Sequence, residues 1–374
     1  MAENTSAMQF TCSSCGGQMQ YSPEAQQLKC IYCEAEQPIP HVDGEIIEND
    51  YEEWVERETR APFYTQGAQN KKVSITEVEE HGGDSTYEVT CKQCGATTTF
   101  DPHVQSQRCP FCDSPLENNE AHLATFWEPN YVVPFAFSQK KCGEAFKKWI
   151  RGKWFAPNAA RKSEIGSKRF SGLYLPFWTY DAQMSCTYVG QRGERVTERD
   201  SEGNTHTTVR WYPAAGSVSH FFDDVLVPAV DSIDRSILDN VTDWKVEAYK
   251  TYNNAYFAGF TTQIYTTDFI QGFEFAHKKM EDATKDLIRS DIGGDEQRIT
   301  SMDMELEDKM FKLLVLPFWV ASFRYKEKVY QVVVNGMTGK VYGKSPVSFW
   351  KVLFTVLVIV AFFVGLLYLN DYFE

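Results

Sequence analysis

The longest apolar run of the chain lies close to its C-terminus. Residues 352–369 contain no charge, and Phe349 and Trp350 extend the run across Lys351. About 20 apolar residues of helix span the hydrocarbon core of a bilayer, whereas a buried core helix usually keeps a polar stripe. The pattern therefore predicts a transmembrane helix over residues 349–370, followed by a short tail at 371–374.

The charges around this run predict its orientation. Residues 1–10 are polar and contain no apolar core of signal-peptide length. Lysines precede the run and carboxylates follow it, which places the bulk of the chain in the cytoplasm by the positive-inside rule. We therefore expect a single-pass, tail-anchored membrane protein. The flanking charges are Lys340, Lys344 and Lys351 on one side, and Asp371 and Glu374 on the other.

Alternating apolar and polar residues predict antiparallel strands in the middle of the chain. Residues 184–188 and 208–211 alternate in this way, and the turn-forming sequence Glu-Gly-Asn at 202–204 lies between them. This pattern is typical of a β-hairpin. A second strand–turn–strand pattern covers 319–326, 329–334, 335–339 and 340–342.

The tetrapeptide Leu-Pro-Phe-Trp occurs twice, at 175–178 and 316–319. Proline at the start of a strand loses no hydrogen-bond donor that the sheet needs. We therefore expect each copy to open a strand, as in a duplicated strand-bearing unit.

Two segments have the period of amphipathic helices. Residues 138–150 begin at Ser138, a predicted N-cap. Residues 268–292 place apolar side chains alternately four and three positions apart and end at a glycine pair. That spacing fits a coiled-coil seam or a helix on a sheet, and we favour the sheet because the run is short for a coiled coil. Since strands and helices do not alternate regularly, we predict an α+β body over residues 123–345.

Eight of the ten cysteines form two copies of the pattern C-x2-C-x14-C-x2-C, offset by 79 residues. Other residues repeat with the same offset, for example Pro23 with Pro102, and Tyr32 corresponds to Phe111, so the two copies are an internal duplication. We expect two small domains, ribbon 1 at 8–36 and ribbon 2 at 87–116. Their cysteines are Cys12, Cys15, Cys30 and Cys33 in ribbon 1, and Cys91, Cys94, Cys109 and Cys112 in ribbon 2.

This spacing predicts structural metal centres of the zinc-ribbon type. A C-x2-C turn brings two thiolates to one metal ion and points backbone N–H groups at the sulfurs, and two such turns close a tetrahedral shell. Gly16 and Gly95 suit the turn because each follows a second cysteine. Zinc is the expected ion, and iron in a rubredoxin-like site is the alternative. Metal binding, roughly 10–16 kcal/mol for such sites, would supply the folding energy of each ribbon.

Disulfides are the other interpretation of these eight cysteines. They conflict with the predicted cytoplasmic location, where thiols stay reduced. The remaining two cysteines, Cys142 and Cys186, have no partner at ligand spacing. We expect both to be buried as small apolar residues.

Composition and charge exclude several classes of protein. The 374 residues are 43% hydrophobic and 24% charged, which excludes a disordered or fibrous chain. The net charge of −14 disfavours a broad nucleic-acid-binding surface. The segment between the ribbons, 37–86, is acidic, and we predict either a solvated linker or a docking segment around Tyr51, Trp54 and Val55.

One basic stretch interrupts the acidic chain at 140–169, beginning on the polar face of the helix predicted at 138–150. Three interpretations stay open. It is a solvated face, or it contacts anionic lipid headgroups beside a membrane tether, or it binds nucleic acid.

No catalytic site is predicted. The sequence contains no Walker loop, no G-x-G-x-x-G after a predicted strand, no H-E-x-x-H and no G-x-S-x-G, and its seven histidines are scattered. Asp223, Asp224 and Asp231 are candidates for a carboxylate cluster, but because the sequence offers them no partner we expect them to be loop residues. The prediction is a protein that is not an enzyme and that needs no cofactor besides the two metal ions.

Four features together carry a resemblance to a known family. They are the paired ribbons, the sequence Leu-Pro-Phe-Trp-Thr-Tyr-Asp at 175–181, the turn Asn-Gly-Met-Thr-Gly at 335–339, and the terminal apolar helix. In these features the chain resembles the bacterial zinc-ribbon membrane proteins of the YdjG type. The ribbons are also similar to those of the replication helicase PriA and the transcription factor TFIIB, but the sequence contains no helicase motor.

The resemblance implies a stress-response protein of the inner (cytoplasmic) membrane. Its partners would be a phage-shock-protein-A-like coat protein, an SPFH-type protein or a second membrane protein. We expect a non-enzymatic adaptor whose apolar ribbon tips, at 31–32 and 110–111, contact protein. The alternative is a membrane-tethered nucleic-acid-binding protein, whose binding would weaken steeply with salt.

Overall fold

The computed structural model describes residues 10–40, 47–60, 83–99, 106–112, 114–117, 122–127, 129–158, 170–199, 205–241, 244, 248–325 and 328–373. It has mixed α+β architecture, which confirms the predicted class. The described residues contain antiparallel and mixed sheets, two four-cysteine clusters and a C-terminal apolar helix.

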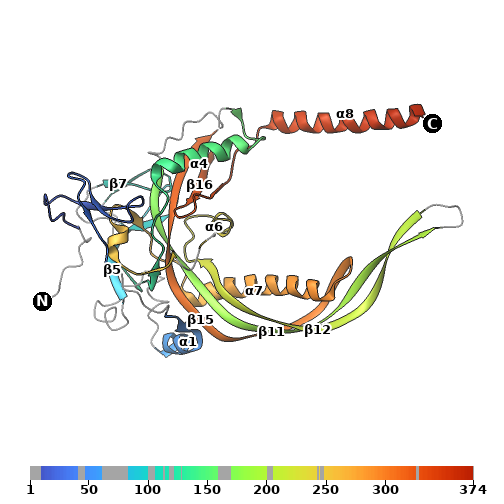
Figure 1. Cartoon of the computed structure of the whole chain (residues 1–374), viewed down its shortest axis with the longest axis horizontal. Coiled ribbons are helices and arrows are strands. Elements are labelled where there is room, and N and C mark those ends of the chain that lie inside the picture. The colour runs from blue at the N-terminus through green and yellow to red at the C-terminus, as the bar shows by residue number, and fades with distance from the viewer. Residues whose placement is uncertain are drawn as a thin grey trace.

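Three long antiparallel strands form the middle of the main sheet, in the order β12-β11-β15. They curve away from the body, and β11 and β12 extend farther than β15 (Figure 1). Their pairing confirms the hairpin predicted around 184–211, whose turn residues 200–204 lie outside the described part of the chain. The strands are β11 (Ser171–Arg199), β12 (Thr205–Pro228) and β15 (Glu296–Tyr325).

Shorter elements complete this sheet and its margins. Strands β15, β16 and β17 pair in sequence, which confirms the predicted strand–turn–strand pattern. The shorter strands are β4 (Asn49–Asp50), β10 (Tyr131–Val132), β13 (Lys250–Thr251), β14 (Thr261–Thr262), β16 (Lys328–Asn335) and β17 (Val341–Gly343). Two short helical turns, α6 (Arg235–Asp239) and η4 (Asn254–Phe257), lie in the connections.

The two Leu-Pro-Phe-Trp copies do not open strands, so that prediction was wrong. They lie inside β11 and β15 and pair with each other, with Leu175 opposite Leu316. Each proline lacks a backbone N–H donor, but its carbonyl still accepts a hydrogen bond. Pro176 accepts from the backbone of Ala229, and Pro317 accepts from the backbone of Gly336. The paired copies lie in the buried part of the sheet.

Helix α7 (Phe269–Ile292) lies along one face of the long strands (Figure 1). The Asp268 carboxylate caps it by accepting a hydrogen bond from the backbone N–H of Gln271 at 2.8 Å. Gly293, with φ of +65°, ends it. The predicted helix on a sheet is confirmed, but its buried side follows a spacing of mostly four residues. That side consists of Phe269, Gly272, Ala276, Met280, Thr284, Ile288 and Ile292.

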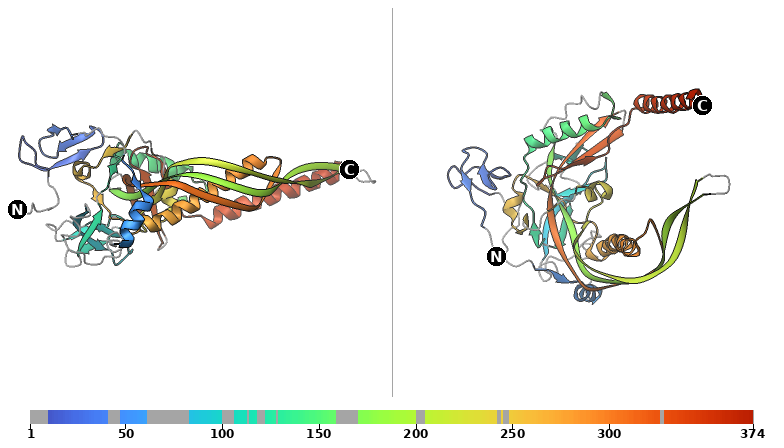
Figure 2. Two further views of the ribbon diagram at one scale, coloured as in Figure 1. Left: turned by 90° about the horizontal axis from the view of Figure 1, so that it is seen from below. Right: turned by 45° about the vertical axis from the view of Figure 1, so that its right-hand side comes forward.

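Side chains alternate across β11, so the sheet has two apolar faces. Tyr174 and Trp178 point to one face, and Leu173 and Leu175 point to the other. Ribbon 1, α4 and α7 pack on the first face, whereas ribbon 2 packs on the second. Figure 2 shows the ribbons on opposite sides of the strands.

Helix α4 (Gln139–Gly152) confirms the helix predicted at 138–150. Cys142, Phe146 and Ile150 form its buried side. Ser138 is its N-cap residue, although the hydroxyl makes no capping hydrogen bond. The predicted burial of Cys142 and Cys186 is also confirmed.

The C-terminal helix α8 (Phe349–Phe373) extends away from the body (Figure 1). Its segment Phe349–Leu366 is long and apolar enough to cross a membrane, and none of those 18 residues is buried. A core helix would cover such a surface, so α8 has the exposure that a membrane span requires.

Candidate metal centres

Ribbon 1 brings its four cysteines together. The sulfurs of Cys12 and Cys33 lie 3.6 Å apart, and those of Cys15 and Cys30 lie 3.5 Å apart. All four sulfurs lie within 4.8 Å of one another. A tetrahedral shell with metal–sulfur bonds of about 2.3 Å needs sulfurs about 3.8 Å apart, so this set fits one metal ion. Strands β1 (Met19–Ser22), β2 (Gln27–Cys30) and β3 (Glu36–Gln37) hold the two turns.

Ribbon 2 repeats this geometry. The Cys91 and Cys112 sulfurs lie 3.6 Å apart, and the Cys94 and Cys109 sulfurs lie 3.7 Å apart. The Ser114 hydroxyl lies 3.0 Å from the Cys91 sulfur and 2.9 Å from the Cys112 sulfur. The surrounding strands are β5 (Gly83–Thr90), β6 (Thr97–Thr99), β7 (Ser106–Arg108), β8 (Pro115–Glu117) and β9 (His122–Trp127).

Local backbone geometry fits the predicted turns. Gly16 and Gly95 have φ of +72° and +75°, a left-handed conformation that glycine adopts without strain. In ribbon 1, backbone N–H groups of Cys33 and Tyr32 lower the pKa of Cys30 to about 6. These features match the turn predicted from the sequence.

The donor sets determine what the centres can do. Four thiolates suit zinc or iron, which are the metals that prefer all-sulfur tetrahedral sites. A complete shell leaves no position for a substrate or an activated water molecule, so each centre would stabilise its ribbon.

Ribbon 1 is fastened to the body by its strands and leaves its tip free. Tyr21 donates a hydrogen bond to the Phe135 carbonyl at 3.2 Å and packs edge-on against the Tyr256 ring. At the opposite end, the side chains of Ile31 and Tyr32 are 48% and 72% exposed. The predicted apolar tip is therefore present on ribbon 1.

Ribbon 2 does not expose the corresponding tip, and that expectation was wrong. Phe111, the counterpart of Tyr32, is completely buried in a cluster with Leu316 and Phe318 of β15. The Phe111 carbonyl also accepts a hydrogen bond from the Ser322 hydroxyl. The tip of ribbon 2 thus anchors the ribbon to the sheet.

Part of the acidic segment between the ribbons docks on the body of the same chain. Helix α1 (Tyr51–Arg60) follows β4, which pairs with β15. The buried Tyr51 ring lies 4.5 Å from the Phe273 ring and 5.9 Å from the Phe269 ring, measured between ring centres. Residues 47–60 therefore dock on α7 and β15 of the same chain, with Tyr51 in the contact.

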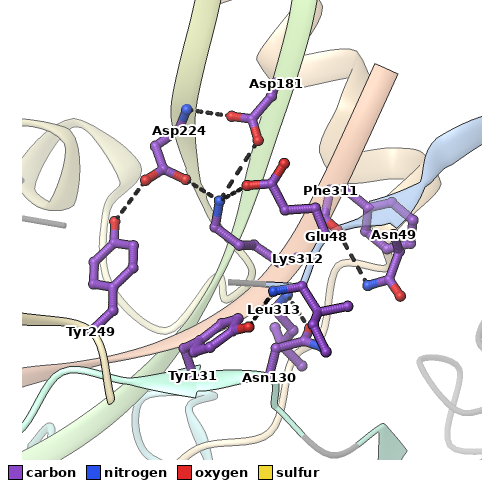
Figure 3. Close-up of polar contacts among 11 residues, drawn as sticks. Glu48, Asn49, Asn130, Tyr131, Asp181, Asp224, Tyr249, Phe311, Lys312 and Leu313 are labelled. Atoms are coloured by element: carbon purple, nitrogen blue, oxygen red, sulfur yellow. Dashed lines mark hydrogen bonds and ion pairs between the residues drawn. The ribbon is translucent and has the colours of Figure 1, made fainter. Parts of the chain in front are cut away.

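A buried ionic cluster lies beside this docked segment (Figure 3). The ammonium of Lys312, which is 2% exposed, lies 2.5 Å from carboxylate oxygens of Glu48 and Asp224, and 3.6 Å from Asp181. Asp181 also accepts a hydrogen bond from the Asp224 backbone, and Tyr249 donates one to the Asp224 carboxylate at 3.1 Å.

The cluster holds three carboxylates and one cation. Burial raises the pKa of Asp181 to about 7, against the opposing effect of Lys312. Burial alone would lower the pKa of Lys312, but Asp224 and Glu48 outweigh it and hold that pKa above its usual range. The three carboxylates are close enough for a metal site, but the lysine ammonium already serves as their cation.

Sequence reasoning missed this cluster. Asp223 and Asp224 were expected in a loop, whereas they lie in β12. Asp231 is exposed and pairs with Arg235 at 3.1 Å, so it takes no part. The available signal was Lys312 itself, a charge that directly precedes the apolar run 313–321.

Comparison with known proteins gives one relative. No family model and no solved structure matches the chain. The chain is similar to a protein of Bacillus subtilis (strain 168) described as uncharacterized protein YdjG, with 26% identity over 233 residues. The alignment covers 62% of this chain and 66% of that protein. The resemblance to YdjG drawn from the sequence is thus confirmed as sequence similarity.

Proposed function

We propose that the protein is a non-enzymatic, membrane-tethered adaptor with two structural zinc ribbons. The difference between the two ribbon tips supports this proposal most strongly, because one tip is buried against the sheet and the other is exposed to solvent. Ribbon 2 fixes its tip against the sheet through Phe111. Ribbon 1 presents Ile31 and Tyr32 on a rigid, metal-closed turn.

Exposed apolar residues on a rigid turn suit a protein partner. Aromatic residues are enriched at the cores of protein interfaces, and a metal-fixed loop loses little conformational entropy on binding. The ribbon 1 tip carries no cation at Ile31 or Tyr32 and belongs to a chain of net charge −14. These features favour protein over nucleic acid as its partner.

The membrane part of the proposal rests on α8. The helix is apolar and exposed over Phe349–Leu366, and the lysines before it favour a cytoplasmic body. Zinc is the proposed metal because the four-thiolate sets fit its preferred coordination.

The proposed context is envelope stress at the inner membrane, supported by the similarity to YdjG-type proteins. The candidate partners are a phage-shock-protein-A-like protein, an SPFH-type protein or a second membrane protein. The adaptor would bring such a partner to the membrane through the ribbon 1 tip.

The test is a crosslinked pull-down of the full chain from detergent-solubilised membranes, with and without nuclease. The variant Ile31→Ser/Tyr32→Ser should lose the protein partner while it keeps both metal ions. Tyr212→Ser, which changes an exposed tyrosine of β12, is the control and should keep the partner. Partners that disappear on nuclease treatment would favour the nucleic-acid-binding alternative, and partners retained by the tip variant would contradict the adaptor site.

A further inference from the structure

The outer face of α4 gathers cations on an acidic chain. Lys140, Lys141, Lys147 and Lys148 are exposed, and none forms an ion pair with another described residue. Glu144 is the only carboxylate in the sequence of α4. Neither the ribbons nor the buried ionic cluster uses this face.

An aromatic tip continues this face beyond the C-terminal end of α4. Trp154 and Phe155 are 61% and 42% exposed and adjacent in the chain, so they form a contiguous apolar patch. The ammonium of Lys153 lies 5.2 Å from the centre of the Trp149 ring. Aromatic residues next to lysines are typical of the interfacial layer of a bilayer.

The aromatic tip lies directly beside the start of α8. The Ser348 backbone N–H donates to the Phe155 carbonyl at 2.8 Å. The Lys351 ammonium donates to the carbonyls of Trp154 and Ala156 at 3.1 and 2.8 Å. Phe349 and Trp350, the first residues of α8, are exposed as well. Four aromatic side chains therefore gather where the apolar helix begins.

The position of the long strands limits which face of the body can lie on the bilayer, because their charged residues must stay outside it. In Figure 1, α8 and the strands β11 and β12 extend to the same side of the body. A membrane plane perpendicular to α8 would cut through these strands, which expose charged residues such as Arg195 and Glu198. A plane laid along the outer face of α4 leaves them on its far side. In Figure 1, α8 runs in roughly the same direction as α4, so to cross this plane it turns at residues 344–348, which lie outside any helix or strand, and gives up the contacts of Lys351 with Trp154 and Ala156.

We propose that the outer face of α4, together with Trp154 and Phe155, lies on the anionic headgroups of the bilayer that α8 enters. The lysines pair with lipid phosphates, and the aromatic rings insert at the level of the headgroups. The contact holds the body in one orientation, with the long strands directed away from the lipid. This inference rests on the proposed membrane tether.

The test places the photo-crosslinking amino acid p-benzoylphenylalanine in the full chain, reconstituted in vesicles of phosphatidylglycerol and phosphatidylcholine. Position 154 probes the proposed contact, position 354 in α8 probes the tether, and position 212 on the long hairpin is the control. Lipid adducts found by mass spectrometry at 154 and 354, with none at 212, are the expected result.

Three outcomes would overturn the inference. Adducts at 354 without adducts at 154 would leave the tether intact and reject the surface contact. No lipid adduct at either position would reject both. Adducts of position 154 with a second copy of the chain, in place of lipid, would make the patch a protein interface.

Charge reversal tests whether the contact depends on anionic headgroups. Lys148→Glu should reduce the lipid adduct at position 154 by about threefold in phosphatidylglycerol vesicles and leave it unchanged in pure phosphatidylcholine. Lys278→Glu on α7, which also reverses an exposed lysine, should have no effect. Equal reduction by the two variants, or the same loss in neutral lipid, would contradict recognition of anionic headgroups.

Discussion

The two ribbons share their metal-ligand pattern and differ in what surrounds it. At the tip, ribbon 1 exposes Tyr32 where ribbon 2 buries Phe111. Beside the sulfurs, ribbon 1 has Ala35 where ribbon 2 has Ser114. Duplication preserved the ligands, because losing one would unfold the ribbon, whereas the tip was free to diverge. One copy packs its tip into the body, and the other leaves its tip exposed.

Removing the metal should have the largest effect, and it should act on each ribbon separately. Cys91→Ser/Cys109→Ser in ribbon 2 should halve the metal content of the full chain and remove roughly 10 kcal/mol or more of metal-binding free energy. Cys12→Ser/Cys30→Ser is the matched change in ribbon 1. Elemental analysis of both variants checks this, and an unchanged metal content in either would contradict the assigned ligands.

The corresponding tip positions should differ sharply in stability. Phe111→Ala should lower the free energy of unfolding by about 3–5 kcal/mol, because it leaves a cavity beside Leu316 and Phe318. Tyr32→Ala should change it by less than about 1 kcal/mol, because the ring is mostly exposed. Chemical denaturation of the detergent-solubilised chain compares the two variants. Equal losses of unfolding free energy in the two variants would contradict the difference between a buried tip on ribbon 2 and an exposed tip on ribbon 1.

The ionic cluster predicts a pH dependence that belongs to the body and to neither ribbon. Burial raises the pKa of Asp181 from 3.8 to about 7 in the folded protein. The stability contributed by its protonated form is therefore fully present below about pH 4 and is lost as the pH rises through 7. The rise of the pKa from 3.8 to about 7, which already includes the opposing effect of Lys312, corresponds to a loss of about 4 kcal/mol.

Unfolding curves measured between pH 4 and pH 8 test this expectation. Asp181→Asn should flatten the pH dependence, because the amide stays neutral at every pH. Asp231→Asn, a change at an exposed carboxylate outside the cluster, should leave it as in the wild type. An equally steep curve in the Asp181 variant would show that another group titrates.

The smallest expected effect concerns the position next to the sulfurs. Ser114→Ala removes a hydroxyl that contacts two ligand sulfurs, and should weaken metal binding to ribbon 2 by about tenfold. Ala35→Ser places a hydroxyl at the matching position of ribbon 1 and should bring its affinity closer to that of ribbon 2. Competition with a chromophoric chelator measures both. Unchanged affinities would show that Ser114 does not tune the centre.

Local patterns predicted much of this molecule. The ligand sets follow from spacing within about 25 residues, and α4, α7, α8 and the long hairpin follow from the periods of apolar residues. The burial of Phe111 could not be predicted from a local pattern, because its ring packs in a cluster with Leu316 and Phe318, far along the chain. Tyr32 and Phe111 occupy the same place in the repeat, so only tertiary packing distinguishes them.

Two other features depended on distant pairing in the same way. The Leu-Pro-Phe-Trp copies looked like strand starts because of their prolines, whereas their pairing with each other places them mid-strand. Lys312 draws one carboxylate from β11, one from β12 and one from the segment before β4. No local pattern links those three positions.

The number of metal ions bound by the full chain tests the central claim most directly. Inductively coupled plasma mass spectrometry of the protein, purified in detergent without added metal, should give two zinc ions per chain. One ion or none would contradict a chain built around two metal-closed ribbons, and with it the contrast between a fixed tip and a free one.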